Sequence, residues 1–562
     1  MKSNRYLALV LFFAFSLFQS QLSAQDLEIE EDGEVQTGEI VIEKDRKIVL
    51  PQARKIYEKI KPVDFETQTL ELPNEFKTFD YSPAAQLPRL NAARPKFDTK
   101  REEDYNSYIK GGFGNFGSPL LIADLGLITD KTRIVRATVD HLSFAKGAVD
   151  GKNSASAYTR AGADARFLGD NVTFSTGLGY TLSTDHFYGY QSGLEFTPEE
   201  IRHKYNFFDA YVGIEDANSK NDADYSLKVG FESTKDNYSA SETLVNIGAG
   251  FNFQKMIFVD AEFITSKYTQ ALFDLSRGYL RLNPYYRLET GDLLLDAGFS
   301  FSTLSGGSET FGSSTVFPFA KARYSISESF SLYAQLDGGI DFNSYTDYAK
   351  ENPFLDDDLN IESSRTNYDF KAGMSVKSGS KISLGASAGL KSVKNFGQYI
   401  GRGSGFSPMT IFYLEGNTKI INVSANILVD ANKDNQFGLG TSFRSFSTKE
   451  IDDFYHVPTL ELQVFGKHKI MEKFTVGWDF GLLGGIKGLD GDILVLQSAI
   501  LVNYPSVKLD PITELNLYLD YQVNDKIGVF IQLNNILNKN YERYLNFPMR
   551  GLQAKAGVSF RF

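Results

Sequence analysis

The last twelve residues of the chain alternate strictly between two kinds of side chain. In an extended strand, one face would carry Leu552, Ala554, Ala556, Val558, Phe560 and Phe562, and the other Gln553, Lys555, Gly557, Ser559 and Arg561. One face is therefore wholly apolar, and the other is polar or lacks a side chain. A soluble β-sandwich could contain such a strand, and so could a membrane barrel that faces lipid on one side and water on the other. The rest of the chain has to decide between them.

The same period of two recurs along most of the chain from Tyr105 onward. Apolar residues occupy every second position over 330–336, 382–390, 474–480 and 515–523, with Ser, Gly, Asn or Asp at most of the positions between them. Each segment alone is a weak signal, but the agreement over so long a stretch predicts an all-β chain.

Short polar turns separate these segments, and they alternate with longer connections. The predicted turns are 130–131, 169–171, 218–222, 254–255, 291–292, 327–329, 379–381, 432–434, 471–473 and 524–525, and the predicted long connections include 184–204, 341–365, 393–417, 486–511 and 538–550. Short turns at one rim and long loops at the other are typical of an outer-membrane barrel, whose strand number is even. Assigning Met409–Leu414 to a long loop keeps every short turn on one rim and gives about 22 strands. We therefore predict a transmembrane antiparallel β-barrel, with the terminal strand pairing with a first strand near 105–112.

Composition agrees with this fold and excludes other classes. The chain has 46 Phe and 30 Tyr but no cysteine, and its formal net charge is −12. Abundant Tyr and Phe without long apolar runs suit a barrel with aromatic girdles, and no run of about 18 apolar residues follows the N-terminus, which excludes spanning helices. The acidic balance argues against nucleic acid as a partner, and the lack of cysteine removes thiol chemistry and disulfides.

The first 104 residues of the chain have a different composition. Lys2 and Arg5 precede an apolar run, Leu7–Phe18, and Leu22-Ser23-Ala24 resembles a cleavage site, so residues 1–24 are predicted to be a cleaved signal peptide. Residues 25–104 contain six of the sixteen prolines and an acidic leader, which predicts a short irregular periplasmic segment. The expected organisation is therefore a signal peptide, this segment and a barrel over 105–562 in the cell outer membrane.

The C-terminal fifty residues resemble one known family. The run Asn534–Glu542, then Phe547-Pro548-Met549, and then the strand ending at Phe562 are similar to the C-terminal end of TonB-dependent receptors. The family resemblance implies a barrel of 22 strands, uptake across the outer membrane and a plug domain in the lumen. This chain has only 25–104 in place of the longer plug, and it reads Met549-Arg550-Gly551 where the family usually has Pro-Gly-Arg. The resemblance therefore implies a receptor-like barrel whose plug is reduced or missing.

Two functions follow as expectations, neither of them enzymatic. The first is uptake of a small solute, as a passive or partner-gated pore resembling a porin; the alternative is a non-transporting structural component of a larger outer-membrane complex. Expected partners are outer-membrane lipid, the barrel-assembly machinery, and TonB or another periplasmic or outer-membrane protein.

Phe560 and Phe562 are the predicted assembly signal, because the terminal strand must face lipid and close the sheet. Glu39, Ile40, Val41 and Ile42 lie where a TonB box would, although a structural strand or a solvated tether fits them too.

Other polar constellations give weaker signals. Asp430, Asn432 and Asp434 have the spacing of the first ligands of a calcium loop, but the required Gly and the final Glu are missing, which favours a hairpin turn. Asp356–Asp358 could hold calcium or be a solvated charge run. The histidines at 141, 186, 203, 456 and 468 lack metal-ligand spacing. No cofactor, metal site or catalytic residue is predicted.

Overall fold

The computed structural model describes residues 107–130, 132–190, 193–217, 222–307, 313–379, 381–401, 408–432, 434–489 and 506–562. The predicted signal peptide, the segment 25–104 and the TonB-box-like residues 39–42 lie outside these ranges. Within them, no helix is long and apolar enough to cross a lipid bilayer.

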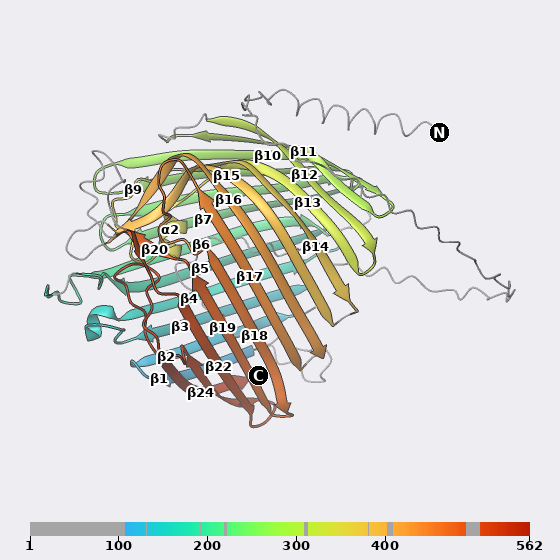
Figure 1. Cartoon of the computed structure of the whole chain (residues 1–562). Coiled ribbons are helices and arrows are strands. Elements are labelled where there is room, and N and C mark those ends of the chain that lie inside the picture. The colour runs from blue at the N-terminus through green and yellow to red at the C-terminus, as the bar shows by residue number, and fades with distance from the viewer. Residues whose placement is uncertain are drawn as a thin grey trace, which may run out of the picture. The chain divides into compact units, whose positions relative to one another are not determined.

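The described residues form one closed antiparallel barrel of 22 strands (Figure 1). The first half comprises β1 (Ser107–Gly114), β2 (Ser118–Thr129), β3 (Arg133–Phe144), β4 (Ser156–Leu168), β5 (Val172–His186), β6 (Arg202–Asp216), β7 (Ala223–Asp236), β8 (Ser241–Phe253), β9 (Ile257–Thr269), β10 (Asp274–Thr290) and β11 (Leu293–Ser305). The second half comprises β12 (Ser314–Ser327), β13 (Phe330–Asp341), β14 (Ser364–Ser378), β15 (Ile382–Gly401), β16 (Met409–Asn432), β17 (Asn435–Ser447), β18 (Leu460–Met471), β19 (Phe474–Gly484), β22 (Ile512–Gln522), β23 (Ile527–Asn534) and β24 (Gln553–Arg561). The predicted fold class and strand number are confirmed.

Each strand pairs with its neighbour in sequence, and β24 pairs with β1 to close the sheet. The closing register places Arg561 opposite Tyr108 and Phe560 opposite Ile109. Closure leaves no unpaired edge strand, which the bilayer interior requires because lipid cannot satisfy backbone hydrogen bonds. The predicted pairing of the terminal strand with the first strand is confirmed.

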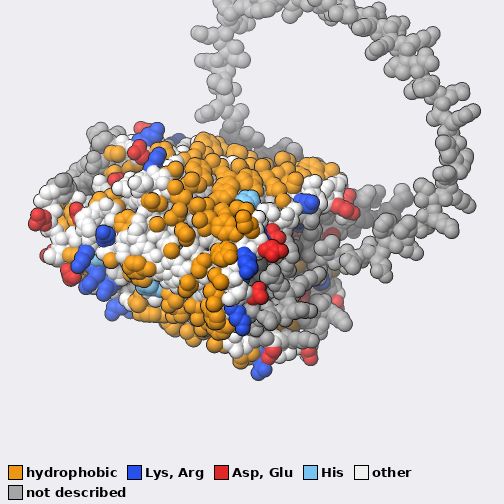
Figure 2. Space-filling view, turned by 90° about the horizontal axis from the view of Figure 1, so that it is seen from below, with side chains coloured by type: hydrophobic (Ala, Val, Ile, Leu, Met, Phe, Trp, Pro, Cys, Tyr) orange, Lys and Arg blue, Asp and Glu red, His pale blue; other side chains and the backbone are white. Residues whose placement is uncertain are grey.

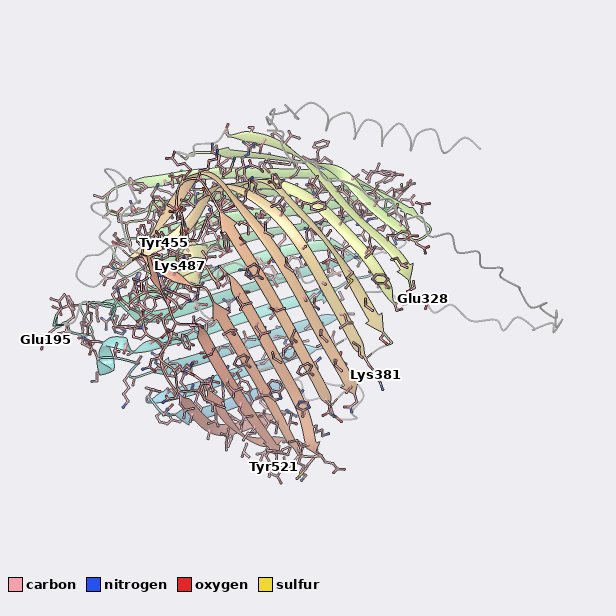
Figure 3. The ribbon with its side chains drawn as sticks, in the orientation of Figure 1. Glu195, Glu328, Lys381, Tyr455, Lys487 and Tyr521 are labelled. Atoms are coloured by element: carbon pink, nitrogen blue, oxygen red, sulfur yellow. The ribbon has the colours of Figure 1, made fainter. Side chains whose placement is uncertain are left out.

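The predicted short turns within the described ranges lie on one rim of the barrel, and the long connections lie on the other, which also has three short turns at 115–117, 237–240 and 270–273. Glu328 and Lys381 lie at the end with the short turns, and Tyr455 and Lys487 at the opposite end (Figure 3). The C-terminal residue is on the short-turn rim, since the Arg561 N–H donates to the Lys526 carbonyl in the last short turn, at 2.8 Å. We assign this rim to the periplasm and the long-loop rim to the exterior, as is usual for outer-membrane barrels.

The outer face of the wall is apolar. Val229, Leu384, Val558 and Phe560 are among its exposed large side chains. In the face drawn in Figure 2, hydrophobic side chains cover the middle, and most of the lysines, arginines and acids lie toward its two ends. The period of two in the sequence thus separates a lipid-facing surface from the lumen.

One predicted loop is wrong. Residues 393–417 contain the upper parts of β15 and β16, and Met409–Leu414 pairs with Phe396–Gly401. The register shifts between Lys394 and Phe396, and Asn395 between them has a left-handed φ of 62°. This bulge lets both strands continue beyond the rest of the wall. The strand count was nevertheless right, because Met409–Leu414 extends β16 and adds no separate strand.

The long loops contain little regular structure of their own. A 3-10 helix, η2 (Gly151–Ser154), lies between β3 and β4, and an α-helix, α2 (Tyr345–Glu351), lies between β13 and β14. The strands β20 (Lys487–Leu489) and β21 (Ser506–Lys508) form a small separate hairpin between β19 and β22. The largest buried apolar cluster lies among these loops at the external end, where it joins loop residues to inward-facing strand residues.

Candidate transport lumen and its closing loop

The inner wall of the barrel is lined by paired charges. Arg136 contacts Asp124 at 2.5 Å, Arg281 contacts Asp337 at 3.1 Å, and Arg287 contacts Asp296 at 2.7 Å. Glu262 and Asp479 also lie on this wall, where they accept hydrogen bonds from Asn246 and Asn516 at 3.4 and 2.8 Å. Asp260 faces the same side as Glu262, two residues further along β9. Such a lining is wettable and suits the passage of a polar solute.

The connection between β13 and β14 folds into this lumen. We call residues 342–363 the lid. It begins with α2, whose N-terminus is capped by Ser344: the Asp347 N–H donates to Ser344 Oγ at 3.0 Å. The large apolar side chains of the lid are buried, namely Tyr345, Phe354, Leu355, Leu359 and Ile361. They pack against inward-facing residues of β6, β9, β15 and β16.

Helix α2 is attached to the inner face of β7 and β8. The Tyr345 hydroxyl donates to Asp236 at 3.1 Å, and Thr346 donates its N–H and its hydroxyl to Glu242 at 2.8 and 2.9 Å. Lys350 contacts Glu232 at 2.6 Å. Glu232 lies four residues below the end of β7, which is roughly 13 Å along the strand. The lid therefore descends into the barrel and does not merely cover its rim.

The second half of the lid reaches other sectors of the mouth. The Met409 N–H donates to the Phe354 carbonyl at 2.7 Å, and the Asp356 N–H donates to the Met409 carbonyl at 2.8 Å. The Phe354 ring stacks on Phe547 of the last loop, with ring centroids 3.9 Å apart, and its edge meets Tyr188 of the β5–β6 connection. The lid thus contacts β7–β9, β16 and the connection between β23 and β24, which are three separate sectors of the barrel circumference.

The two ends of the lid are clasped together at what we call its neck. Arg277 of β10 donates to the Asn343 carbonyl at 2.6 Å and to Ser363 Oγ at 3.4 Å. Asn395 donates to the Ser363 carbonyl at 2.8 Å and to Glu362 at 2.9 Å. Arg277 and Asn395 are both almost fully buried. The neck is therefore a compact group of hydrogen bonds at the root of the lid.

The family-like run near the C-terminus builds the last external connection, residues 535–552, which we call the final loop. Asn535 is fully buried with a left-handed φ of 49°, and its side chain donates to the carbonyls of Lys539 and Arg550 at 2.7 and 2.9 Å. Its N–H donates to Asn516 on the inner wall at 2.9 Å, and Tyr541 donates to Glu514. Asparagine tolerates this backbone conformation better than most residues. In this chain, these motif residues fix the loop against which the lid packs.

The predicted acidic run does not form a solvated stretch or a calcium site. Asp356 is buried, Asp357 accepts a hydrogen bond from Ser239 at 2.7 Å, and Asp358 accepts one from Gln270 at 2.7 Å. The run is part of the lid, so the expectation of a solvated charge run is wrong. Asn432 accepts the Asp434 N–H at 2.9 Å within a hairpin turn, as predicted.

Two histidines also belong to the packed mouth. His203 lies against the lid, with Nδ1 3.2 Å from the Pro353 carbonyl and Nε2 3.5 Å from Asp236. His456 is held between the Tyr399 carbonyl at 2.8 Å and the Leu545 N–H at 3.2 Å, and burial lowers its pKa to about 4. In the ranges that the structure describes, no three His, Cys, Asp or Glu residues are grouped so as to hold a metal ion. These histidines therefore act as buried hydrogen-bonding groups.

The predicted assembly residues lie on the outer face at the periplasmic rim. Phe560 is 42% exposed and Phe562 is 48% exposed, and their rings stack with centroids 5.4 Å apart. This position is compatible with recognition during assembly, which stays a prediction.

Comparison with known proteins gives a fold but no close relative. No family model and no curated protein matches the chain. Among solved structures, the siderophore receptor PirA from Acinetobacter baumannii aligns with a TM-score of 0.61 at 11% identity, over 81% of this chain and 80% of PirA. The FrpB iron transporter from Neisseria meningitidis aligns with a TM-score of 0.62 at 11% identity, over 82% of each chain. The pyoverdine receptor FpvA from Pseudomonas aeruginosa PAO1 aligns with a TM-score of 0.59 at 12% identity, over 83% and 79%.

These structural neighbours are transport receptors, and the chain shares their barrel. The resemblance to TonB-dependent receptors is confirmed at the level of the fold. The barrel fold and its apolar outer belt point to the outer membrane.

Proposed function

We propose that the protein admits a small solute across the outer membrane through the barrel lumen, and that the lid gates this passage. The observation that supports the proposal best is the lid itself, which descends into a polar lumen and contacts three sectors of the wall. Barrels of 22 strands otherwise enclose a wide channel that needs a plug. The similar structures include a siderophore receptor, a pyoverdine receptor and an iron transporter, which supports uptake as the direction of transport.

The energetics of the lid favour a gated channel over a passive one. Burying the five large apolar side chains of the lid stabilises the closed state by on the order of 10 kcal/mol. Because each 1.4 kcal/mol is tenfold in population, the open state would stay below roughly one part in a million. Even half of that free energy leaves the open state populated at about one part in several thousand. A solute or partner must therefore bind the open state preferentially to supply the opening free energy.

The partner of this gate is proposed to act from the periplasm or at the external loops. TonB or another periplasmic protein would engage the N-terminal segment 25–104 through Glu39–Ile42. Solute specificity would reside in lid and wall residues that become accessible on opening.

Swelling of proteoliposomes in neutral sugars of increasing size tests the proposal. Four proteins are compared: the full chain, a chain without residues 25–104, a chain in which 343–363 are replaced by an Asn-Gly turn, and the double deletion. We expect little permeability in the full chain and a large increase on removal of the lid. If only the double deletion is permeable, the N-terminal segment closes the pore as well. A lack of permeability in all four folded proteins would refute transport through the lumen.

The firm attachment of the lid also favours a second function, that of a permanently closed component of a larger outer-membrane assembly. Purification from native membranes under mild conditions separates the two. Stoichiometric co-purification with other outer-membrane proteins, together with no uptake defect on deletion of the gene, would support the structural role.

A further inference from the structure

We propose that the lid opens as one piece about its neck, and that the final loop is the catch that holds it closed. The inference rests on the proposed function, because it specifies how that gate moves. Two sets of contacts hold the lid. Those at the neck join the root of the lid to nearby strands, whereas those further along the lid reach other sectors of the barrel wall.

The neck contacts can persist while the lid swings. Arg277 and Asn395 bind the main-chain carbonyls of Asn343 and Ser363, which lie where the lid leaves β13 and returns to β14. Asn343 also donates to the Glu362 carbonyl at 2.8 Å, which ties the outgoing chain to the returning chain. These groups lie close to any axis through the root of the lid, so a rotation displaces them little. Paired ends of this kind are suited to a hinge.

The contacts with the final loop must break for the lid to leave the lumen. The Phe354 and Phe547 rings are nearly parallel, with an interplanar angle of 19°, and Tyr544 meets the edge of Phe354 at a centroid distance of 6.2 Å. The Tyr188 hydroxyl donates to the Pro548 carbonyl at 3.2 Å, which adds the β5–β6 connection to the same group. Aromatic pairs of this kind stabilise beyond the area that they bury.

The final loop holds its position independently of the lid. Its hydrogen bonds through Asn535 and Tyr541 go to itself and to the inner wall at Asn516 and Glu514. The Phe547 ring also lies directly against Gly189, where a Cβ atom would come within 2.9 Å of the ring. A partner or solute that displaces the final loop therefore removes the catch without touching the neck.

Cysteine pairs test the hinge in a chain that contains no cysteine. The background is Phe354→Ala, which weakens the catch, and Gly189→Ala is a second background that displaces Phe547 and leaves the lid side chains intact. A lid lock joins Leu355 to Met409, which are bridge partners. A neck lock joins Asp341 to Ser364, and a control joins Ser387 to Ser424 within the wall. Backbones paired in this way lie within reach of a disulfide.

The readout is liposome swelling with the disulfide formed and after its reduction. We expect both backgrounds to be more permeable than the full chain, the lid lock to abolish this added permeability reversibly, and the neck lock and the control to leave it unchanged. If the neck lock abolished permeability, the hinge would be refuted, because the lid would then have to open by separating its two ends. Permeability that persists in the lid lock would also overturn it. If both backgrounds stay closed while the lid deletion conducts, the catch is refuted and the proposed function stands. If the lid deletion is also closed, the proposed function fails.

Discussion

The stack between Phe354 and Phe547 gives the most quantitative prediction. Phe354 is only 6% exposed, and its ring contacts Phe547, Tyr188 and Tyr544. Replacing a buried Phe by Ala typically costs about 3–5 kcal/mol. Since the contact exists only with the lid closed, most of this cost falls on the closed state. The opening equilibrium of Phe354→Ala should therefore rise by about a hundredfold to a thousandfold.

A double-mutant cycle with Phe547→Ala isolates the stack itself. The coupling between the two substitutions should be about 0.5–1.5 kcal/mol, the usual contribution of an aromatic pair beyond burial. The assay is the fraction of time that single channels spend open in planar bilayers. Phe299→Ala is the matched control, because Phe299 is 50% exposed on the lipid-facing wall. Equal opening in Phe354→Ala and Phe299→Ala, or strictly additive effects in the cycle, would show that the stack does not hold the lid closed.

Four further predictions concern the attachment of the lid, its pH response, the final loop and assembly. Glu242→Gln, which removes the charged acceptor of the two hydrogen bonds from Thr346, should raise the open fraction by roughly tenfold, measured in the same bilayer assay. Burial in the closed lid raises the pKa of Glu351 from 4.5 to about 8, so the closed state binds a proton that the open state releases. The closed state therefore loses stability as the pH rises through this range, and opening should be more frequent at pH 8.5 than at pH 5. Glu351→Gln should make the open fraction less dependent on pH. Asn535→Ala should make the final loop a site of limited proteolysis, whereas an unchanged digestion pattern would contradict its anchoring role. Replacing Phe560 and Phe562 by Ser should abolish the folded, heat-modifiable barrel on gels, and normal amounts of folded barrel would argue against an assembly signal.

The barrel wall could be predicted from sequence because its signal is local. The period of two and the polar turns such as Gly291-Asp292 depend on neighbouring residues alone, and each turn predicted within the described ranges lies on the periplasmic rim. Met409–Leu414 was misassigned for an equally local reason: the break before it looked like the end of a strand, whereas the bulge at Asn395 carries the pairing past it.

The lid could not be predicted in the same way. Glu242 and Thr346 are 104 residues apart, and nothing near either residue indicates the other. One local signal does indicate a buried lid: the connection contains the apolar residues Phe354, Leu355, Leu359 and Ile361. Such residues in a long external loop indicate that the loop is buried against something.

We propose that the lid closes the lumen from outside, and labelling of one introduced cysteine tests this closure. Glu262 lies on the inner wall of β9, six residues from Tyr268, which contacts the lid, and this spacing is roughly 20 Å along the strand. Cells carrying Glu262→Cys are treated with a maleimide attached to a polymer too large to cross the outer membrane by other routes. We expect almost no labelling in the full chain and rapid labelling when residues 343–363 are replaced by an Asn-Gly turn. Equal, rapid labelling of both proteins would contradict it.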